Sequence, residues 1–188
     1  MDGGDPQLEK ISVSIVTTEW GEFDLILSIG DRSLKIYLAY GCFCFEHFIS
    51  WLKTVETGSA QKPYPIDEEG PDKALVIEPL VAPGLIDFRV VDPYAEEETV
   101  FIRGILERKQ FISAIKQEIF RYFKEEFVIE KFIGYIPPGA LETALMEYLG
   151  PEKFREEYGE RQQSFEQEPP QMHFGERILA DPWFADQF

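Results

Sequence analysis

The sequence predicts an α+β domain built from a duplicated βββα unit. Twice along the chain, the spacing of hydrophobic residues changes from a period of two, typical of strands, to three or four, typical of helices. In addition, residues 48–53 read FISWLK and residues 111–116 read FISAIK, 63 positions later, at the same place in the two patterns. An ungapped alignment of residues 21–56 with residues 84–119 has seven identities. We therefore interpret the repeated letters as equivalent packing positions in two copies.

The first copy, residues 11–57, is expected to hold three strands and a helix. Alternating apolar residues predict strands at 11–15, 23–29 and 34–40, and the short turns between them require an antiparallel order. The helix that follows should end at Gly58. Its apolar stripe is expected to consist of Phe45, Phe48, Ile49, Leu52 and Val55.

The second copy, residues 74–127, repeats this order. Strands are predicted at 74–81, 85–91 and 99–106, followed by a helix of about 20 residues. Pro79 predicts that the first of these strands lies at a sheet edge or contains a bulge. Because one βββα unit has only a thin core, we expect the units to join as one mainly antiparallel six-stranded sheet, with both helices on one face. In each Phe-Ile-Ser triplet, Phe and Ile should point inward and Ser outward.

A single domain is expected to span residues 1–188. Residues 58–73, rich in Gly, Pro and acidic residues, are interpreted as a linker between the copies. Residues 137–188 are expected to form a C-terminal helix and tail, with the helix closed by Gly150 and Pro151. The tail ends in DPWFADQF. Its rings either dock on the chain's own sheet, which would hide aggregation-prone surface, or recognise another protein.

Charge is the most unusual property of the composition. The chain has 18 basic and 35 acidic residues, a net charge of −17. Nucleic acids and anionic membranes bind proteins largely through Lys and Arg, so neither is expected as a partner. No apolar run is long enough to span a membrane, and the segment MDGGDPQLEK does not resemble a secretory signal. Cys42 and Cys44 are too close for a disulfide in an extended strand, which favours a reducing compartment. We expect a cytoplasmic protein.

Catalytic and metal-binding motifs are weak. Cys42, Cys44 and His47 form C-x-C-x2-H, but a structural zinc site needs four ligands, so we expect no metal and interpret the cysteines as small buried hydrophobes. Asp24 and Asp87 hold equivalent positions in the two copies. A carboxylate pair can act as general acid and base, although a turn role, with each Asp hydrogen-bonding its own backbone, is the simpler interpretation. No motif for a Ser nucleophile or a phosphate-binding loop is present, so we expect no cofactor and no enzymatic activity.

Two acidic clusters are the best candidate sites, because they lie in loops between apolar runs. Such clusters either keep a protein soluble or dock a basic partner. With two aromatic residues of the tail they form the predicted partner-binding set: Asp67, Glu68, Glu69, Asp72, Glu96, Glu97, Glu98, Trp183 and Phe184.

The leading hypothesis is a non-enzymatic protein that binds a basic protein, for example an inhibitor or immunity-type protein that neutralises a toxin or nuclease. One alternative is a self-associating subunit, such as a homodimer in which the C-terminal aromatic residues insert into a neighbour. The other is an enzyme built on paired carboxylates.

Overall fold

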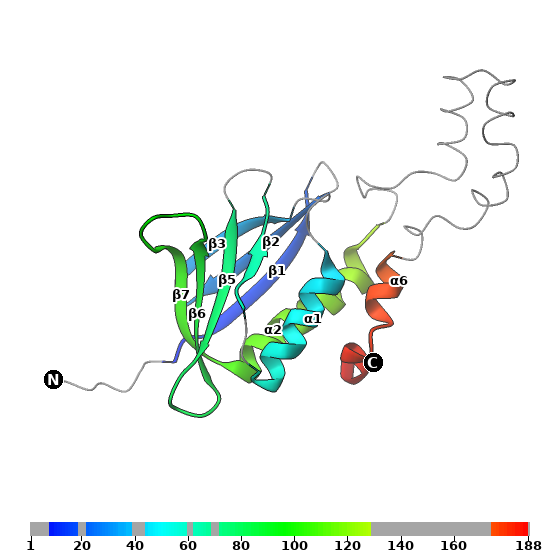
Figure 1. Cartoon of the computed structure of the whole chain (residues 1–188). Coiled ribbons are helices and arrows are strands. Elements are labelled where there is room, and N and C mark those ends of the chain that lie inside the picture. The colour runs from blue at the N-terminus through cyan, green and yellow to red at the C-terminus, as the bar shows by residue number, and fades with distance from the viewer. Residues whose placement is uncertain are drawn as a thin grey trace, which may run out of the picture.

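The chain has an α+β fold with two antiparallel sheets, of three and four strands (Figure 1). The computed structural model describes residues 8–18, 22–38, 44–59, 62–68, 72–128 and 174–187. Helices α1 and α2 lie next to each other on one side of the strands, and the C-terminal segment lies beyond them, away from the sheets. The hydrophobic core is therefore enclosed between the strands and the helix pair.

The first unit is a three-stranded meander followed by a helix. Strands β1 (Ile11–Thr17), β2 (Phe23–Ile29) and β3 (Arg32–Leu38) pair in the order β1-β2-β3. Helix α1 (Phe45–Thr57) follows and ends at Gly58, whose φ of 73° is the left-handed conformation that glycine adopts at little cost. The predicted alternation is confirmed most clearly in the central strand, which buries Phe23, Leu25, Leu27 and Ile29.

The second unit has one strand more than the sequence predicted. Strands β4 (Tyr64–Ile66), β5 (Lys73–Pro79), β6 (Leu85–Asp92) and β7 (Thr99–Glu107) pair in that order. Helix α2 (Arg108–Arg121) follows directly and continues as the π-helical turn η1 (Tyr122–Glu126). The short β4 was missed because three residues with a central proline show no alternation.

Strand β5 is internal, and not the edge strand that Pro79 predicted. The neighbouring strand β4 pairs only with the first residues of β5, from Lys73 to Leu75. At Pro79 the β4 side of the strand is therefore open, so a residue without an N–H group interrupts no ladder there.

The strands form two sheets where a single six-stranded sheet was expected, and the reason lies at the edges of the three-stranded sheet. The N–H of Ile15, on the β1 edge, donates to Glu118 Oε1 of α2 at 2.6 Å. The N–H of Tyr37, on the β3 edge, donates to Glu68 Oε1 at 2.6 Å. Both edges thus have a donor occupied by a carboxylate, which removes a bonding position that another strand would need.

The two sheets approach each other at Gly104 of β7. A Cβ atom at this position would lie 2.6 Å from Cγ2 of Ile29 in β2, which is closer than two carbon atoms can approach. Beside this contact, the N–H of Glu9 donates to the carbonyl of Ile105 at 3.0 Å. Glycine is required at residue 104 because any side chain would push the two sheets apart.

The two Phe-Ile-Ser triplets occupy the predicted sides of their helices. The Phe and Ile residues are at most 4% exposed, whereas both Ser residues are exposed; the six residues are Phe48, Ile49, Ser50, Phe111, Ile112 and Ser113.

The C-terminal segment docks on the chain's own helices, and not on the sheet. It consists of helix α6 (Phe174–Leu179) and the 3₁₀ turn η3 (Pro182–Gln187), which together are called the tail below. Phe184 is completely buried and Trp183 is 8% exposed. The Trp183 indole N–H donates to Glu56 of α1 at 2.8 Å, and the Phe184 ring lies 6.0 Å from the Phe120 ring of α2.

The helix predicted after Pro138 lies outside the described residues, as do Cys42 and Glu69. Among the helices that the structure describes, none combines the length and the apolar character needed to cross a membrane.

Replacing Glu118 by Ala should lower the free energy of unfolding by about 2 kcal/mol, because it leaves the Ile15 N–H without an acceptor. The same change removes the carboxylate that Arg121 contacts at 2.6 and 2.8 Å. Urea unfolding of the two proteins measures the loss. Glu125→Ala, at an exposed residue of η1, is the control. Equal denaturation midpoints for the two variants would contradict this role of Glu118.

Acid should release the tail, because docking depends on the ionised form of Asp181. Burial alone would raise the pKa of Asp181, but hydrogen bonds from Lys53 Nζ at 2.7 and 2.8 Å and from the Trp183 N–H, with the charge of Lys53, lower it. A carboxyl group with a lowered pKa stabilises the docked state above its ordinary pKa of about 4, and this stabilisation is lost as the pH falls through the lowered value.

Fluorine NMR of 5-fluorotryptophan-labelled protein can follow this release. The resonance of Trp183, assigned with Trp183→Phe, should move to the position of an exposed indole below about pH 4. Asp181→Asn should weaken docking at neutral pH and reduce its pH dependence. A Trp183 resonance that stays at one position from pH 7 to pH 3 would contradict the dependence on Asp181.

Candidate functional site

Two acidic loops that are separate in the sequence lie at the same end of the four-stranded sheet. Lys73, at the start of β5, pairs with Ile66, and Thr99, at the start of β7, pairs with Asp92. Since β5 and β6 are antiparallel neighbours, the β4–β5 and β6–β7 loops leave the sheet at the same end, the upper one in Figure 1. We call this surface the acidic end. Its described acids are Asp67, Glu68, Asp72, Glu96, Glu97 and Glu98.

Glu68 is the one member of this group whose carboxylate is turned inward. Its side chain is 8% exposed. One oxygen accepts the Tyr37 N–H, and the other is paired with Lys73 Nζ. Burial lowers the pKa of Lys73, in keeping with an ammonium side chain that is only 11% exposed. The Glu68 charge therefore holds β3 against β5, whereas Asp67, Glu96 and Glu97 are exposed to solvent.

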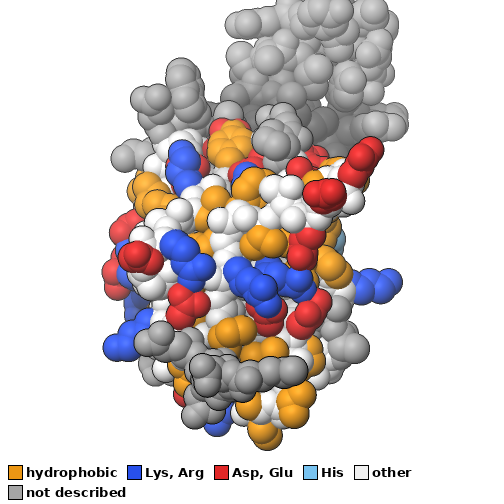
Figure 2. Space-filling view, turned by 90° about the vertical axis from the view of Figure 1, so that its left-hand side faces the viewer, with side chains coloured by type: hydrophobic (Ala, Val, Ile, Leu, Met, Phe, Trp, Pro, Cys, Tyr) orange, Lys and Arg blue, Asp and Glu red, His pale blue; other side chains and the backbone are white. Residues whose placement is uncertain are grey.

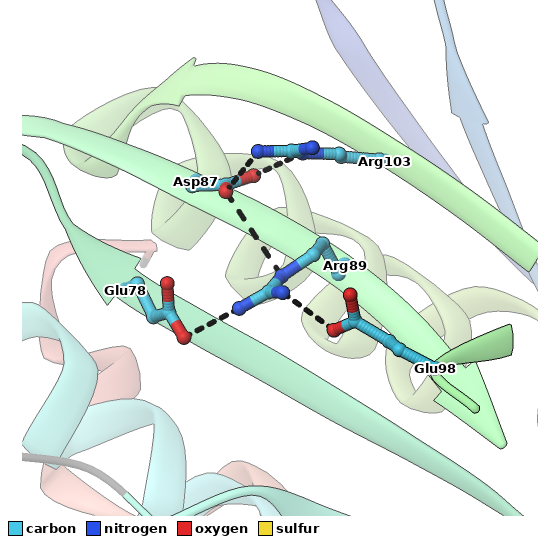
Figure 3. Close-up of polar contacts among 5 residues, drawn as sticks. All are labelled: Glu78, Asp87, Arg89, Glu98 and Arg103. Carbon is cyan, nitrogen blue, oxygen red and sulfur yellow. Dashed lines mark hydrogen bonds and ion pairs between the residues drawn. The ribbon is translucent and has the colours of Figure 1, made fainter. Parts of the chain in front are cut away.

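Glu98 belongs to a charge network across the outer face of β5, β6 and β7 (Figure 3). The Arg89 guanidinium, only 12% exposed, contacts Glu78 and Glu98, each at 2.5 Å. Arg103 donates two hydrogen bonds to Asp87, at 2.9 and 2.7 Å. Arg89 Nε lies 3.9 Å from Asp87 Oδ2 and joins the two groups. Glu78 and Glu98 are held by a buried cation while more than half of each side chain remains exposed.

Asp24 and Asp87 do not have the turn role expected for them. Both lie inside strands and pair with a cation on the next strand: Asp24 with Lys35 at 3.0 Å, and Asp87 with Arg103. The hydrogen bonds from Arg103 and the charge of Asp87 raise the pKa of Arg103. Asp24 lies in the three-stranded sheet and Asp87 in the four-stranded sheet, each with a cation of its own.

Exposed apolar side chains lie beside the acidic end. Tyr94, in the β6–β7 loop, is 79% exposed, and Phe101 of β7 is 42% exposed. The Tyr94 N–H donates to Asp92 Oδ1 at 2.9 Å, an Asx-type turn that orients the loop. Lys73 Nζ lies 5.3 Å from the centre of the Phe101 ring. The surface therefore combines exposed carboxylates with large rings, the residue types that steer and anchor protein complexes.

On the sheet side of the molecule, basic and acidic side chains are interspersed. Figure 2, which views the left-hand side of Figure 1, shows Lys and Arg interleaved with Asp and Glu and with hydrophobic side chains. The net charge of −17 is thus not spread as a uniform acidic face on this side. Exposed acidic side chains are also found in loops, at Asp67, Glu96 and Glu97.

The remaining predicted site residues lie elsewhere. Trp183 and Phe184 belong to the tail and are buried against α1 and α2. Cys44 precedes α1, with its Sγ 3.5 Å from Glu46 Oε2, and His47 is exposed on α1. No three His, Cys, Asp or Glu side chains within the described ranges are grouped in a way that could hold a metal ion.

Sequence reasoning missed the charge network and the exposed Tyr94. Asp87 and Arg89 alternate with apolar residues, which marks them as outward-facing, but only the strand register reveals that Glu78 and Arg103 are their partners. Tyr94 lies in the loop DPYAEEE, from which the predicted binding set contained only the three glutamates. Comparisons of the chain with protein-family models, curated proteins and solved structures found no match.

Arg89→Ala should lower the free energy of unfolding by about 2 kcal/mol, because three carboxylates then lose their shared cation and repel one another. Arg103→Ala should have a smaller effect, since Arg103 is 58% exposed and Arg89 stays near Asp87. Urea unfolding at low and high salt measures both changes. If the Arg103 variant is the less stable of the two, the assignment of Arg89 as the centre of the network is wrong.

Proposed function

We propose that the chain is a non-enzymatic binding protein that docks a basic protein partner on the acidic end. The observation that carries this proposal is that two acidic loops leave the sheet at the same end, where exposed rings also lie. The β6–β7 loop supplies Glu96, Glu97 and the exposed Tyr94, and the β4–β5 loop adds the exposed Asp67 at the same end of the sheet. Together they combine the two properties of a binding surface, a local field of one sign and apolar anchors.

The exposed acids and the rings would have different tasks. Asp67, Glu96 and Glu97 would attract the partner from a distance and so raise the association rate. Tyr94 and Phe101 would be buried on contact and so slow dissociation.

A pre-organised surface supports this division. Arg89 holds the carboxylate of Glu98 by an ion pair at 2.5 Å, and Asp92 orients the loop that carries Tyr94. Side chains that are already ordered lose less conformational entropy when a partner binds. A partner with a cationic active site, such as a nuclease or a toxin, has the complementary charge. An inhibitor or immunity-type protein that covers such a site is the class that we favour.

We also infer that the two units arose by duplication of one βββα unit. Residues 63 positions apart have matching contacts: Asp24 and Asp87 each pair with a cation on the next strand, and Lys53 and Lys116 each pair with an aspartate of the tail. These matching contacts support the duplication more strongly than the sequence identities between the two units do.

Reversing two exposed charges of the acidic end should reduce partner capture. Wild-type protein and the Glu96→Lys/Glu97→Lys variant, immobilised separately, are exposed to native extract at low salt, and bound proteins are quantified by mass spectrometry. The partner should be basic and at least tenfold depleted on the variant, a loss of about 1.4 kcal/mol. With the purified partner, Tyr94→Ala should raise the dissociation rate about 30-fold, equivalent to about 2 kcal/mol.

The matched control is Asp31→Lys/Glu125→Lys, which changes the net charge equally at exposed residues outside the acidic end. This control should keep the partner. Equal loss on both variants would mean that total charge, and not this surface, decides binding. An association rate that is unchanged between low and high ionic strength would also contradict the proposal.

A further inference from the structure

We propose that the surface of α1 and α2 under the tail is a recognition site for the tail segment, and that its partner in trans is the tail of a second copy of this chain. We call this surface the tail site and define it by Glu46, Lys53, Glu56, Lys116 and Phe120. It lies on the helix side and is separate from the acidic end.

Two equivalent lysines give the tail site its charge specificity. Lys53 of α1 contacts both carboxylate oxygens of Asp181, at 2.7 and 2.8 Å. Lys116 of α2 pairs with Asp186 at 2.5 Å. The lysines hold the same position in the two helices, 63 residues apart. Each helix therefore binds one aspartate of a segment in which the aspartates are five residues apart.

Apolar anchors lie between these ion pairs. Trp183 and Phe184 are buried, and the Lys116 ammonium lies 5.3 Å from the centre of the Trp183 ring. Glu56 accepts the indole N–H at 2.8 Å, and Phe120 lies beside Phe184. The site thus binds a segment of defined composition, in which two carboxylates flank two adjacent aromatic residues.

The tail is held in the manner of a bound peptide. The backbone hydrogen bonds described for it are internal, such as Ala180 N–H to Glu176 and Phe184 N–H to Asp181. Its described contacts with α1 are made by side chains: Arg177, Asp181 and Trp183. A cavity of about 260 Å³ remains where Asp186 and Gln187 approach α2. Contacts of this kind form and break without disturbing the strand ladders.

The connection to the tail is long enough to reach another molecule. Residues 129–173 separate α2 and η1 from the tail, and at about 3.3–3.6 Å per residue they span at most about 160 Å. The radius of gyration of a domain of this size is roughly 16 Å. Two copies that exchange tails would make every tail contact twice, in a closed symmetric dimer.

Within one chain, the tail and its site are tethered, so docking in cis does not depend on the protein concentration. The wild-type chain at micromolar concentration should therefore be monomeric, with the tail docked in cis. The exchanged form should dominate when the pairing within each chain is made unfavourable and the pairing between chains favourable.

A pair of charge-reversed variants creates this situation in the full-length chain. One variant carries Lys53→Glu and Lys116→Glu, and the other carries Asp181→Lys and Asp186→Lys. In each variant alone, the tail site and the tail carry charges of the same sign, so docking within one chain is repulsive. In an equimolar mixture, the reversed site of the first variant can bind the reversed tail of the second. The native site of the second variant can likewise bind the native tail of the first. Size-exclusion chromatography with light scattering should show monomers separately and a 1:1 dimer in the mixture.

Two controls are needed to interpret this experiment. The quadruple variant, with both reversals in one chain, restores matched charges in cis and should be monomeric. Wild type mixed with either variant should stay monomeric, because one of its two exchanged pairings is repulsive.

A second pair, Lys53→Glu with Asp181→Lys, avoids the buried Lys116 and remains informative if the first pair folds poorly, since Lys53 is 41% exposed. A mixture that elutes at monomer mass overturns the proposal, whether the fluorine signal of Trp183 shows a released tail or one that is still docked in cis. Because none of these changes touches the acidic end, the result is independent of partner capture there.

Discussion

Two buried carboxylates join the units of this protein, and the arrangement of the sheets depends on them. Glu118 reaches from α2 to the β1 edge, and Glu68 reaches from the β4–β5 loop to the β3 edge. Each accepts a strand N–H and is neutralised by a cation, Arg121 or Lys73. A buried carboxylate is tolerated only when it is paired and hydrogen-bonded. Because these contacts occupy donors at both edges of the three-stranded sheet, that sheet ends there and the second sheet stays separate.

The acidic residues of the described chain serve three physical purposes. Some, like Glu68 and Glu118, are structural and buried. Others, like Asp87 and Glu98, are ordered by arginines on the outer face of the four-stranded sheet. Acids in the loops, like Glu96, are exposed. Net charge gives the sign of the field around the molecule, but only the exposed carboxylates, among them Glu96 and the ion-paired Glu98, lie at its surface. The acidic end is distinctive because it gathers members of this group beside Tyr94.

The helix side is organised differently, because one lysine from each of the two helices contacts the tail. Lys53 and Lys116 hold two aspartates of the tail, and the rings between them complete the site. The acidic end and the tail site differ in charge, in composition and in location. A binding function at one and exchange of the tail at the other are therefore compatible in the same molecule.

The sequence by itself determined the order and type of the elements. Period-two and period-three-to-four patterns are local, so they predicted six of the seven described strands, both long helices, the end of α1 at Gly58 and the burial of the Phe-Ile-Ser triplets. Only the tertiary structure decided the division into two sheets, the added strand β4, the inward turn of Glu68, the placement of both acidic loops at one end of the sheet and the position of the tail. These features depend on strand register and on partners 31 to 128 residues apart in the chain. No local pattern encodes such pairings, because a side chain's period shows which way it faces and not what it will meet there.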